Sequence, residues 1–164
     1  MNRKTLILYA SQYGYGAECA NQLRSLMPEE VTLVDLTKAT NPDLDGYDTV
    51  IVGGSVYMGK AMRQTIDFCA ANESALLQRK LGLFLCCGLP QNVEQSFAAS
   101  FSEPLRKHAT VSGCFGGELR LDKMKPMHKM IANMMQKAGG KSGIEPPKPN
   151  PKAINEFASA MQSN

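Results

Sequence analysis

Residues 5–16 read TLILYASQYGYG, and this stretch decides the fold. A short apolar run, Thr5–Tyr9, leads into an uncharged loop that is rich in hydroxyl groups and glycine. The residues after the loop keep one apolar face at helical spacing, from Ala17 to Met27. A buried strand, a polar loop and an amphipathic helix in this order are typical of the first unit of an α/β sheet.

The same alternation of strand and helix continues along the chain. Helical apolar faces recur at 62–70 and 93–105. Near-continuous apolar strands joined by helix-length connections require a parallel sheet that is covered on both faces. The sequence therefore predicts an α/β fold with a doubly wound, five-stranded parallel sheet and helices on both faces. The other four predicted strands are Val31–Leu36, Thr49–Gly53, Lys80–Cys86 and Thr110–Phe115.

Length and pattern predict one domain over residues 1–164, since a domain typically has about 150 residues. A segment at about 117–142 exceeds what a strand-to-helix connection needs and is interpreted as an insertion. It carries a stripe of methionines among lysines and ends at Gly139-Gly140. A final helix is predicted over 151–162, with Asn150 as N-cap and Pro151 at its first position.

Composition narrows the function classes. The chain is 43% hydrophobic and 20% charged, as expected for a globular protein. Its net charge of +3 is too small to favour nucleic-acid binding. No apolar run approaches the roughly 18 residues of a membrane span, and the N-terminus lacks the pattern of a secretory signal, so a cytoplasmic protein is expected. The five cysteines form no C-x-x-C motif, and buried, reduced thiols are predicted instead of a metal or disulfide site.

The loop after the first strand is the predicted ligand site, because open α/β sheets bind ligands beyond the carboxyl ends of their strands. It opens onto a helix whose free N–H groups suit a phosphate. A second interpretation is a dinucleotide site, with Gly14, Gly16 and a ribose-binding Asp35. Four residues separate the strand from Gly14 and the third glycine is missing, so this interpretation ranks second. No Gly-Lys-Ser/Thr follows, which excludes a Walker loop.

Two stretches carry a family resemblance. Ser11-x-x-Gly14-x-Gly16 resembles the FMN-phosphate loop of the flavodoxins, usually S/T-x-T-G-x-T, and Leu44–Ser55 resembles their third strand. The resemblance covers the whole chain and implies the strand order 2-1-3-4-5. More narrowly, Gly53–Lys60 and the Met/Lys-rich insertion resemble the flavodoxin-like, quinone-dependent protoporphyrinogen oxidases.

The resemblance implies an FMN site built from three segments. Tyr57 is the expected stacking residue, whereas Tyr13 and Gly16 stand where the family usually has threonine. The flavin carries the redox chemistry in such proteins, so no catalytic side chain is assigned, and no metal site is expected. The phosphate segment is Ser11, Gln12, Tyr13, Gly14, Tyr15 and Gly16, and the ring segments are Ser55, Val56, Tyr57, Met58 and Gly59, and Cys87, Gly88, Leu89 and Pro90.

The Met/Lys-rich stripe has two interpretations of equal weight. In the first, the stripe packs on the protein's own sheet edge. In the second, residues 123–141 contact an anionic membrane surface, a quinone or a porphyrinogen. The positive net charge disfavours an ordinary acidic electron shuttle.

The expected function is an FMN-binding oxidoreductase or electron-transfer protein. The narrower resemblance implies dehydrogenation of protoporphyrinogen IX with a quinone acceptor, a reaction of heme biosynthesis. The alternatives are a non-enzymatic flavodoxin electron carrier, an NAD(P)H- or quinone-linked flavin reductase, and a binding module without flavin. The sequence predicts no particular oligomeric state.

Overall fold

The computed structural model describes residues 3–28, 30–39, 41–87, 92–117 and 148–163. Its strands are β1 (Lys4–Ala10), β2 (Glu30–Asp35), β3 (Thr49–Tyr57), β4 (Lys60–Ala61), β5 (Lys80–Cys86) and β6 (Val111–Cys114). Its helices are α1 (Tyr15–Leu26), α2 (Arg63–Ala71), α3 (Glu73–Leu77), α4 (Val93–Ser100), α5 (Glu103–His108) and α7 (Pro151–Gln162).

Five of the described strands form one parallel sheet in the order β2-β1-β3-β5-β6. Numbered in chain order without the two-residue β4, this is the predicted order 2-1-3-4-5, so the predicted sheet is confirmed. The short β4 pairs antiparallel with the end of β3 and was not predicted.

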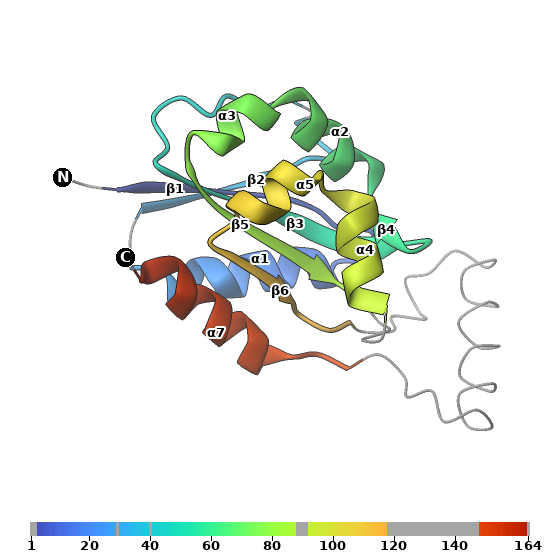
Figure 1. Cartoon of the computed structure of the whole chain (residues 1–164). Coiled ribbons are helices and arrows are strands. Elements are labelled where there is room, and N and C mark those ends of the chain that lie inside the picture. Colours follow the sequence, from blue (N-terminus) through green and yellow to red (C-terminus); the bar gives the residue numbers. More distant parts are fainter. Residues whose placement is uncertain (1–2, 29, 40, 88–91, 118–147, 164) are drawn as a thin grey trace, which may run out of the picture.

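Both faces of the sheet are covered by helices. Because alternate strand residues point to opposite sides, neighbouring residues of one strand belong to different core clusters. Leu6 and Leu8 of β1 belong to the cluster that contains residues of α2, α3, α4 and α5. Ile7, between them, belongs to the cluster that contains residues of α1 and α7. Figure 1 shows the same division, with α1 and α7 below the sheet and α2, α3 and α5 above it. Burial on both sides explains why the strands are near-continuous apolar runs.

The single helical face predicted over 93–105 is divided between two helices. The chain becomes extended at Phe101, and Ser102 then caps α5, its Oγ accepting from the Leu105 N–H at 3.4 Å. Pro104 explains the break, because its ring would clash with a carbonyl group of the preceding turn in one continuous helix. The prediction of one helix was therefore wrong, although its apolar face is buried as expected.

Helix α7 begins as the pair Asn150-Pro151 predicts. The Asn150 Oδ1 accepts from the Ala153 N–H at 3.2 Å. The helix lies close to the sheet because two strands present glycine to Phe157. A Cβ on Gly82 or on Gly113 would stand 2.8 or 2.9 Å from this ring.

Residues 118–147 lie outside the described part of the chain, so the interpretation of the Met/Lys-rich stripe stays a prediction. The described residues on either side are joined at the carboxyl edge of the sheet. Gly116 forms an antiparallel bridge with Pro149, and the Gly117 N–H donates to the Lys148 carbonyl O at 3.1 Å.

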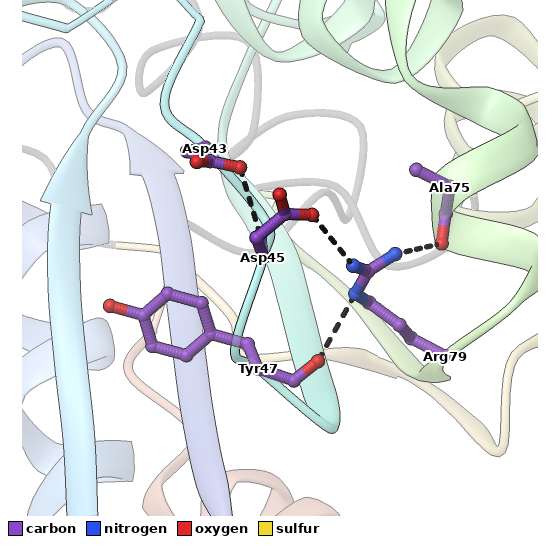
Figure 2. A network of polar contacts seen from close by, with 5 residues as sticks. All are labelled: Asp43, Asp45, Tyr47, Ala75 and Arg79. Carbon is purple, nitrogen blue, oxygen red and sulfur yellow. Dashed lines mark hydrogen bonds and ion pairs between the residues drawn. The ribbon is translucent and has the colours of Figure 1, made fainter.

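Arg79, between α3 and β5, fixes the loop that leads into β3 (Figure 2). Its Nη1 donates to the Ala75 carbonyl O at 2.8 Å and its Nε donates to the Tyr47 carbonyl O at 3.1 Å. Its Nη2 lies 3.7 Å from the Asp45 Oδ1, and the Asp45 N–H donates to the Asp43 Oδ1 at 2.9 Å. Because the Arg79 side chain is only 17% exposed, it replaces water as the donor to both carbonyl groups.

We expect Arg79→Ala to lower the free energy of unfolding by about 2–3 kcal/mol, since two carbonyl groups lose charge-assisted hydrogen bonds. Urea denaturation measures the change. Arg63→Ala is the matched control. Arg63 forms an exposed i,i+4 pair with Asp67 at 3.4 Å, and its loss should cost less than about 0.5 kcal/mol. Equal losses in the two variants would contradict the role given to Arg79.

Candidate functional site

The carboxyl ends of β1, β3 and β5 meet where the strand order reverses. The chain leaves β1 toward β2 on one side, and β3 lies on the other. In register, Ala10 pairs with Gly54, and Ser55 pairs with Cys86. The loop that begins at Ser11 therefore lies beside Ser55, at the edge where open α/β sheets bind ligands.

Two serine hydroxyls hold the loop after β1. The Ser11 Oγ accepts from the Gly14 N–H at 3.1 Å, and the Ser55 Oγ accepts from the Gln12 N–H at 3.4 Å. The Gln12 side-chain amide donates to the Tyr13 hydroxyl at 3.4 Å. A hydroxyl that accepts from a backbone N–H still has its own proton, which it can donate to a ligand oxygen.

Gly16 brings the loop and β3 into close contact. A Cβ at this position would stand 3.1 Å from the Ser55 Oγ and 3.2 Å from both the Cβ and the Oγ of Ser11. Gly16 is buried, and no larger residue fits there without a shift of one serine. The structure therefore brings together three of the residues that the sequence singled out, from two separate segments.

The start of α1 offers free backbone donors. Gly14 is the N-cap with φ 97°, and among the described residues no side chain caps the helix. The first bond of the helix runs from the Glu18 N–H to the Gly14 carbonyl O at 3.0 Å, so the N–H groups of Tyr15, Gly16 and Ala17 have no acceptor within α1. Their dipoles and the positive end of the helix favour an anion.

Residues 55–59, which follow the predicted end of the third strand at Gly53, belong to a hairpin. Strand β3 continues to Tyr57 and pairs with β4 through Val56–Ala61 and Tyr57–Lys60. The two turn residues, Met58 and Gly59, both have positive φ, 56° and 83°, as tight two-residue hairpins require. The predicted end of the third strand at Gly53 was wrong, because strand pairing continues past the glycines at 53–54.

The hairpin is anchored to α4 and presents apolar side chains. The Ala61 N–H donates to the buried Ser100 Oγ at 2.7 Å. Tyr57 is 41% exposed and Met58 is 80% exposed, whereas Val56 is half-buried against the core. A rigid strand end with an exposed aromatic ring suits the stacking role expected of Tyr57. The sequence did not single out Ser100, whose contact depends on the tertiary arrangement.

The third expected segment is described only at its first residue. Cys87 is buried, and its carbonyl O accepts from the Cys114 Sγ at 3.9 Å. Gly88, Leu89 and Pro90 lie outside the described residues, so their contact with a flavin ring stays a prediction.

The predicted burial of the thiols is confirmed for Cys19, Cys69, Cys86 and Cys87, whereas Cys114 is half-buried. Burial raises the pKa of Cys69 to about 12. The pKa of Cys86 is raised by its hydrogen bond with Cys19 and by burial. The pKa of Cys114 is raised by its hydrogen bond with Cys87 and by burial. These three thiols remain protonated at neutral pH and are poor nucleophiles.

Asp35, the residue on which the dinucleotide interpretation depends, has a local structural role. Its Oδ1 accepts from the Thr37 N–H at 2.9 Å and from the Thr37 Oγ1 at 2.6 Å. These bonds close the turn after β2. Both bonds use Oδ1, so a ribose hydroxyl would bind the second carboxylate oxygen, Oδ2.

One link to the site had no signal in the sequence. The Tyr15 hydroxyl donates to the Phe115 carbonyl O at 2.6 Å, across 100 residues of chain. Tyr15 was selected only as a member of the phosphate segment. No spacing or motif could have indicated a bond to a main-chain atom beyond β6.

Two further properties concern only the described residues. No helix among them has the length and apolar character needed to cross a membrane. No group of three or more His, Cys, Asp or Glu residues among them could hold a metal ion.

Solved structures share this fold at low identity. A short-chain flavodoxin associated with a non-canonical PDU bacterial microcompartment has TM-score 0.59 and 17% identity, over 97% of this chain and 96% of that one. A flavoprotein in complex with FMN from Lactobacillus acidophilus has TM-score 0.54 and 16% identity, over 68% and 93%. The rubredoxin oxygen:oxidoreductase of Desulfovibrio gigas has TM-score 0.57 and 12% identity, over 98% of this chain but only 37% of that one.

The comparison with curated proteins found no significant match. The structural similarities show the fold, and a family model shows the family to which the chain belongs. The model, described as a flavodoxin domain, matches residues 6–144, which is most of the sequence. This chain therefore belongs to the flavodoxin domain family.

Proposed function

We propose that this chain binds FMN at the carboxyl edge of its sheet and acts as an electron-transfer protein or FMN-dependent oxidoreductase. One observation carries the proposal. Ser11, Gly16 and Ser55 converge at the uncapped start of α1, where the strand order reverses. Membership of the flavodoxin domain family and the fold shared with an FMN-bound flavoprotein support it.

The described residues fit the phosphate of FMN. The hydroxyls of Ser11 and Ser55 lie within 3.2 Å of the Cβ position at Gly16, so that both reach the helix start. The free N–H groups there supply several donors to a dianion, which compensate for the missing threonine hydroxyls at 13 and 16. The segment Ser11–Gly16 contains no carboxylate that would repel the phosphate.

The ring side of the proposed site is formed by the β3–β4 hairpin. Tyr57, exposed on this anchored strand end, is the proposed stacking residue. Aromatic rings stack in offset arrangements that bury much of both faces. The backbone after Cys87 stays the predicted partner of the pyrimidine edge.

The flavin, when bound, supplies the redox chemistry. The chain's own residues would hold the phosphate, orient the ring and control access. Met58, 80% exposed at the hairpin tip beside Tyr57, places an adaptable apolar side chain where a partner would approach. This arrangement needs no side-chain acid or base.

The test is to titrate the purified protein with FMN and, separately, with riboflavin, and to record visible absorption before and after removal of free ligand. Retained FMN at about one per chain, with much weaker retention of riboflavin, is expected, because riboflavin lacks the phosphate that the Ser11–Gly16 segment would bind. A protein that retains neither flavin would refute the proposal. The dinucleotide interpretation with Asp35 would then be tested with NADH.

The narrower proposal is dehydrogenation of a porphyrinogen with a quinone acceptor. Its support is that Gly53–Lys60 and the segment at about 117–142 resemble the flavodoxin-like, quinone-dependent protoporphyrinogen oxidases. Most of the second segment lies outside the described residues. The flavin-loaded protein should convert protoporphyrinogen IX to its fluorescent product faster with menaquinone present. The heat-denatured protein with the same amount of FMN is the control.

An electron carrier is the second candidate. The alignment with a short-chain flavodoxin covers 97% of this chain and 96% of that one, which supports this candidate. A carrier would exchange electrons with a flavodoxin reductase but would not increase porphyrinogen or quinone turnover. The proposed partners are therefore a redox protein for the carrier, and a quinone or porphyrinogen for the enzyme.

A further inference from the structure

A hydrogen bond joins the start of α1 to the end of β6. The Phe115 carbonyl O accepts from the Tyr15 hydroxyl at 2.6 Å and from the Asn150 N–H at 3.1 Å. The Tyr15 ring is half-buried against the cluster that contains Phe115 and Cys19. Burial raises the pKa of the Tyr15 phenol, so the hydroxyl keeps the proton that it donates.

The acceptor lies on a firmly connected piece of backbone. Residues 115–117 and 148–150, which we term the β6–α7 junction, are joined by the bridge between Gly116 and Pro149 and by the bond from Gly117 to Lys148. A Cβ on Gly116 would stand 2.1 Å from the Lys148 carbonyl O, so the two segments of the junction are in direct contact. The junction therefore gives the Tyr15 hydroxyl a fixed point of attachment.

The donor belongs to the proposed phosphate site. The Tyr15 N–H has no acceptor within α1, and a Cβ on the next residue, Gly16, would stand 3.1–3.2 Å from Ser55 and Ser11. Fixing the phenol restricts rotation of the first helical turn about its axis. The direction of the free N–H groups depends on this rotation.

We infer that Tyr15 is a positioning residue that ties the first turn of α1 to the β6–α7 junction and thereby sets the preference of the site for phosphorylated flavin. The inference rests on the proposed function, since it concerns how that site distinguishes FMN from riboflavin. Linkage is reciprocal: a phosphate that stabilises the first turn of α1 also stabilises the junction to which that turn is attached.

The first test compares Tyr15→Phe with the wild-type chain in FMN and riboflavin titrations. The Kd for FMN should rise about fivefold to tenfold, which corresponds to one lost hydrogen bond that orients the donors. The Kd for riboflavin should change less than twofold. Tyr47→Phe is the control, because it removes a phenol oxygen at the amino edge of β3, far from the phosphate, and should change neither value. A merely structural role of Tyr15 would lower the thermal midpoint without changing the ratio of the two Kd values.

The second test uses backbone amides of the junction. Hydrogen exchange of the Gly117 and Asn150 N–H groups should slow several-fold when FMN binds to the wild-type chain, and should not slow with riboflavin. In Tyr15→Phe, FMN should lose this effect. This measurement detects the coupling between the first turn of α1 and the β6–α7 junction, and it does not depend on turnover.

The outcomes separate the two proposals. A wild-type chain that retains no FMN would overturn both. If FMN binds but Tyr15→Phe keeps the wild-type ratio of Kd values and the junction shows no FMN-dependent protection, the inference is overturned and the FMN proposal stands. If Tyr15→Phe does not fold, wild-type exchange decides: slower exchange with FMN supports the connection, and unchanged exchange overturns it.

Discussion

Replacing Gly54 by alanine should leave little folded protein, with a loss of more than about 4 kcal/mol in the free energy of unfolding. A Cβ at Gly54 would stand 2.1 Å from the Ala10 carbonyl O and 2.9 Å from the Ala10 N. These are main-chain atoms of β1, which is paired on both sides and cannot move away. The φ of 140° at Gly54 is also one that L-residues rarely adopt. Soluble yield, circular dichroism and urea denaturation measure the effect.

Gly46→Ala is the matched control. Gly46 also has a positive φ, 87°, but a Cβ there would meet nothing within 4 Å. Its replacement should cost only the conformational strain, about 1–2 kcal/mol. If Gly54→Ala were as stable as Gly46→Ala, backbone strain alone would account for the loss in the free energy of unfolding. The close approach of β1 and β3 at Gly54 would then not be needed for stability.

The expected effect at Gly54 also concerns the site. The close approach of Ala10 and Gly54 determines how near Ser11 and Ser55, the next residue in each segment, lie to one another. A shift of β3 away from β1 would separate the two serines before it exposed the core. A partly folded Gly54→Ala protein should therefore have lost FMN binding.

The sheet could be predicted because its strands are buried on both faces. Such strands are near-continuous apolar runs, and the connections between them have helical periodicity, so the order of elements was readable. The family resemblance added the order of strands in space. The third strand was ended too early, at Gly53, because glycine usually weakens a strand. In the structure the strand continues through Gly53 and Gly54. Glycine is needed at position 53 because a Cβ there would stand 2.2 Å from the Phe84 carbonyl O of the neighbouring strand.

The location of the site followed from topology, but its internal contacts did not. The carboxyl edge at the reversal of strand order can be inferred once the strands are known. The contact between Gly16 and Ser55 depends on the register of β1 and β3, which the sequence does not encode locally. The bond from Tyr15 to Phe115 depends on packing between elements 100 residues apart.

Restoring the family's threonine at position 16 should weaken FMN binding. The resemblance alone would suggest the opposite, because threonine adds a hydroxyl that could bind the phosphate. A Cβ at position 16, however, would stand 3.1 Å from the Ser55 Oγ and 3.2 Å from the Ser11 Oγ. Each of these oxygens accepts from a backbone N–H of the loop, so neither serine can move without loss of a hydrogen bond. Such overpacking costs about 1–3 kcal/mol, and relieving it shifts the serines that would bind the phosphate, so we expect the Kd for FMN to rise at least about fivefold in Gly16→Thr.

Gly16→Ala separates the clash from the added hydroxyl, because it introduces only the Cβ. We expect it to raise the Kd for FMN by nearly as much as Gly16→Thr. Alanine is the better helix former by about 1 kcal/mol, which offsets part of the cost of the clash, so the free energy of unfolding should fall by no more than about 2 kcal/mol. Weaker binding in a protein that remains folded would locate the effect in the loop. If Gly16→Thr binds FMN more tightly than the wild-type chain, the serines yield to the side chain and the contact seen at Gly16 does not limit the site. If only Gly16→Ala binds FMN weakly, the threonine hydroxyl compensates for the clash by a bond to the phosphate, and this chain retains the site geometry of the full family motif.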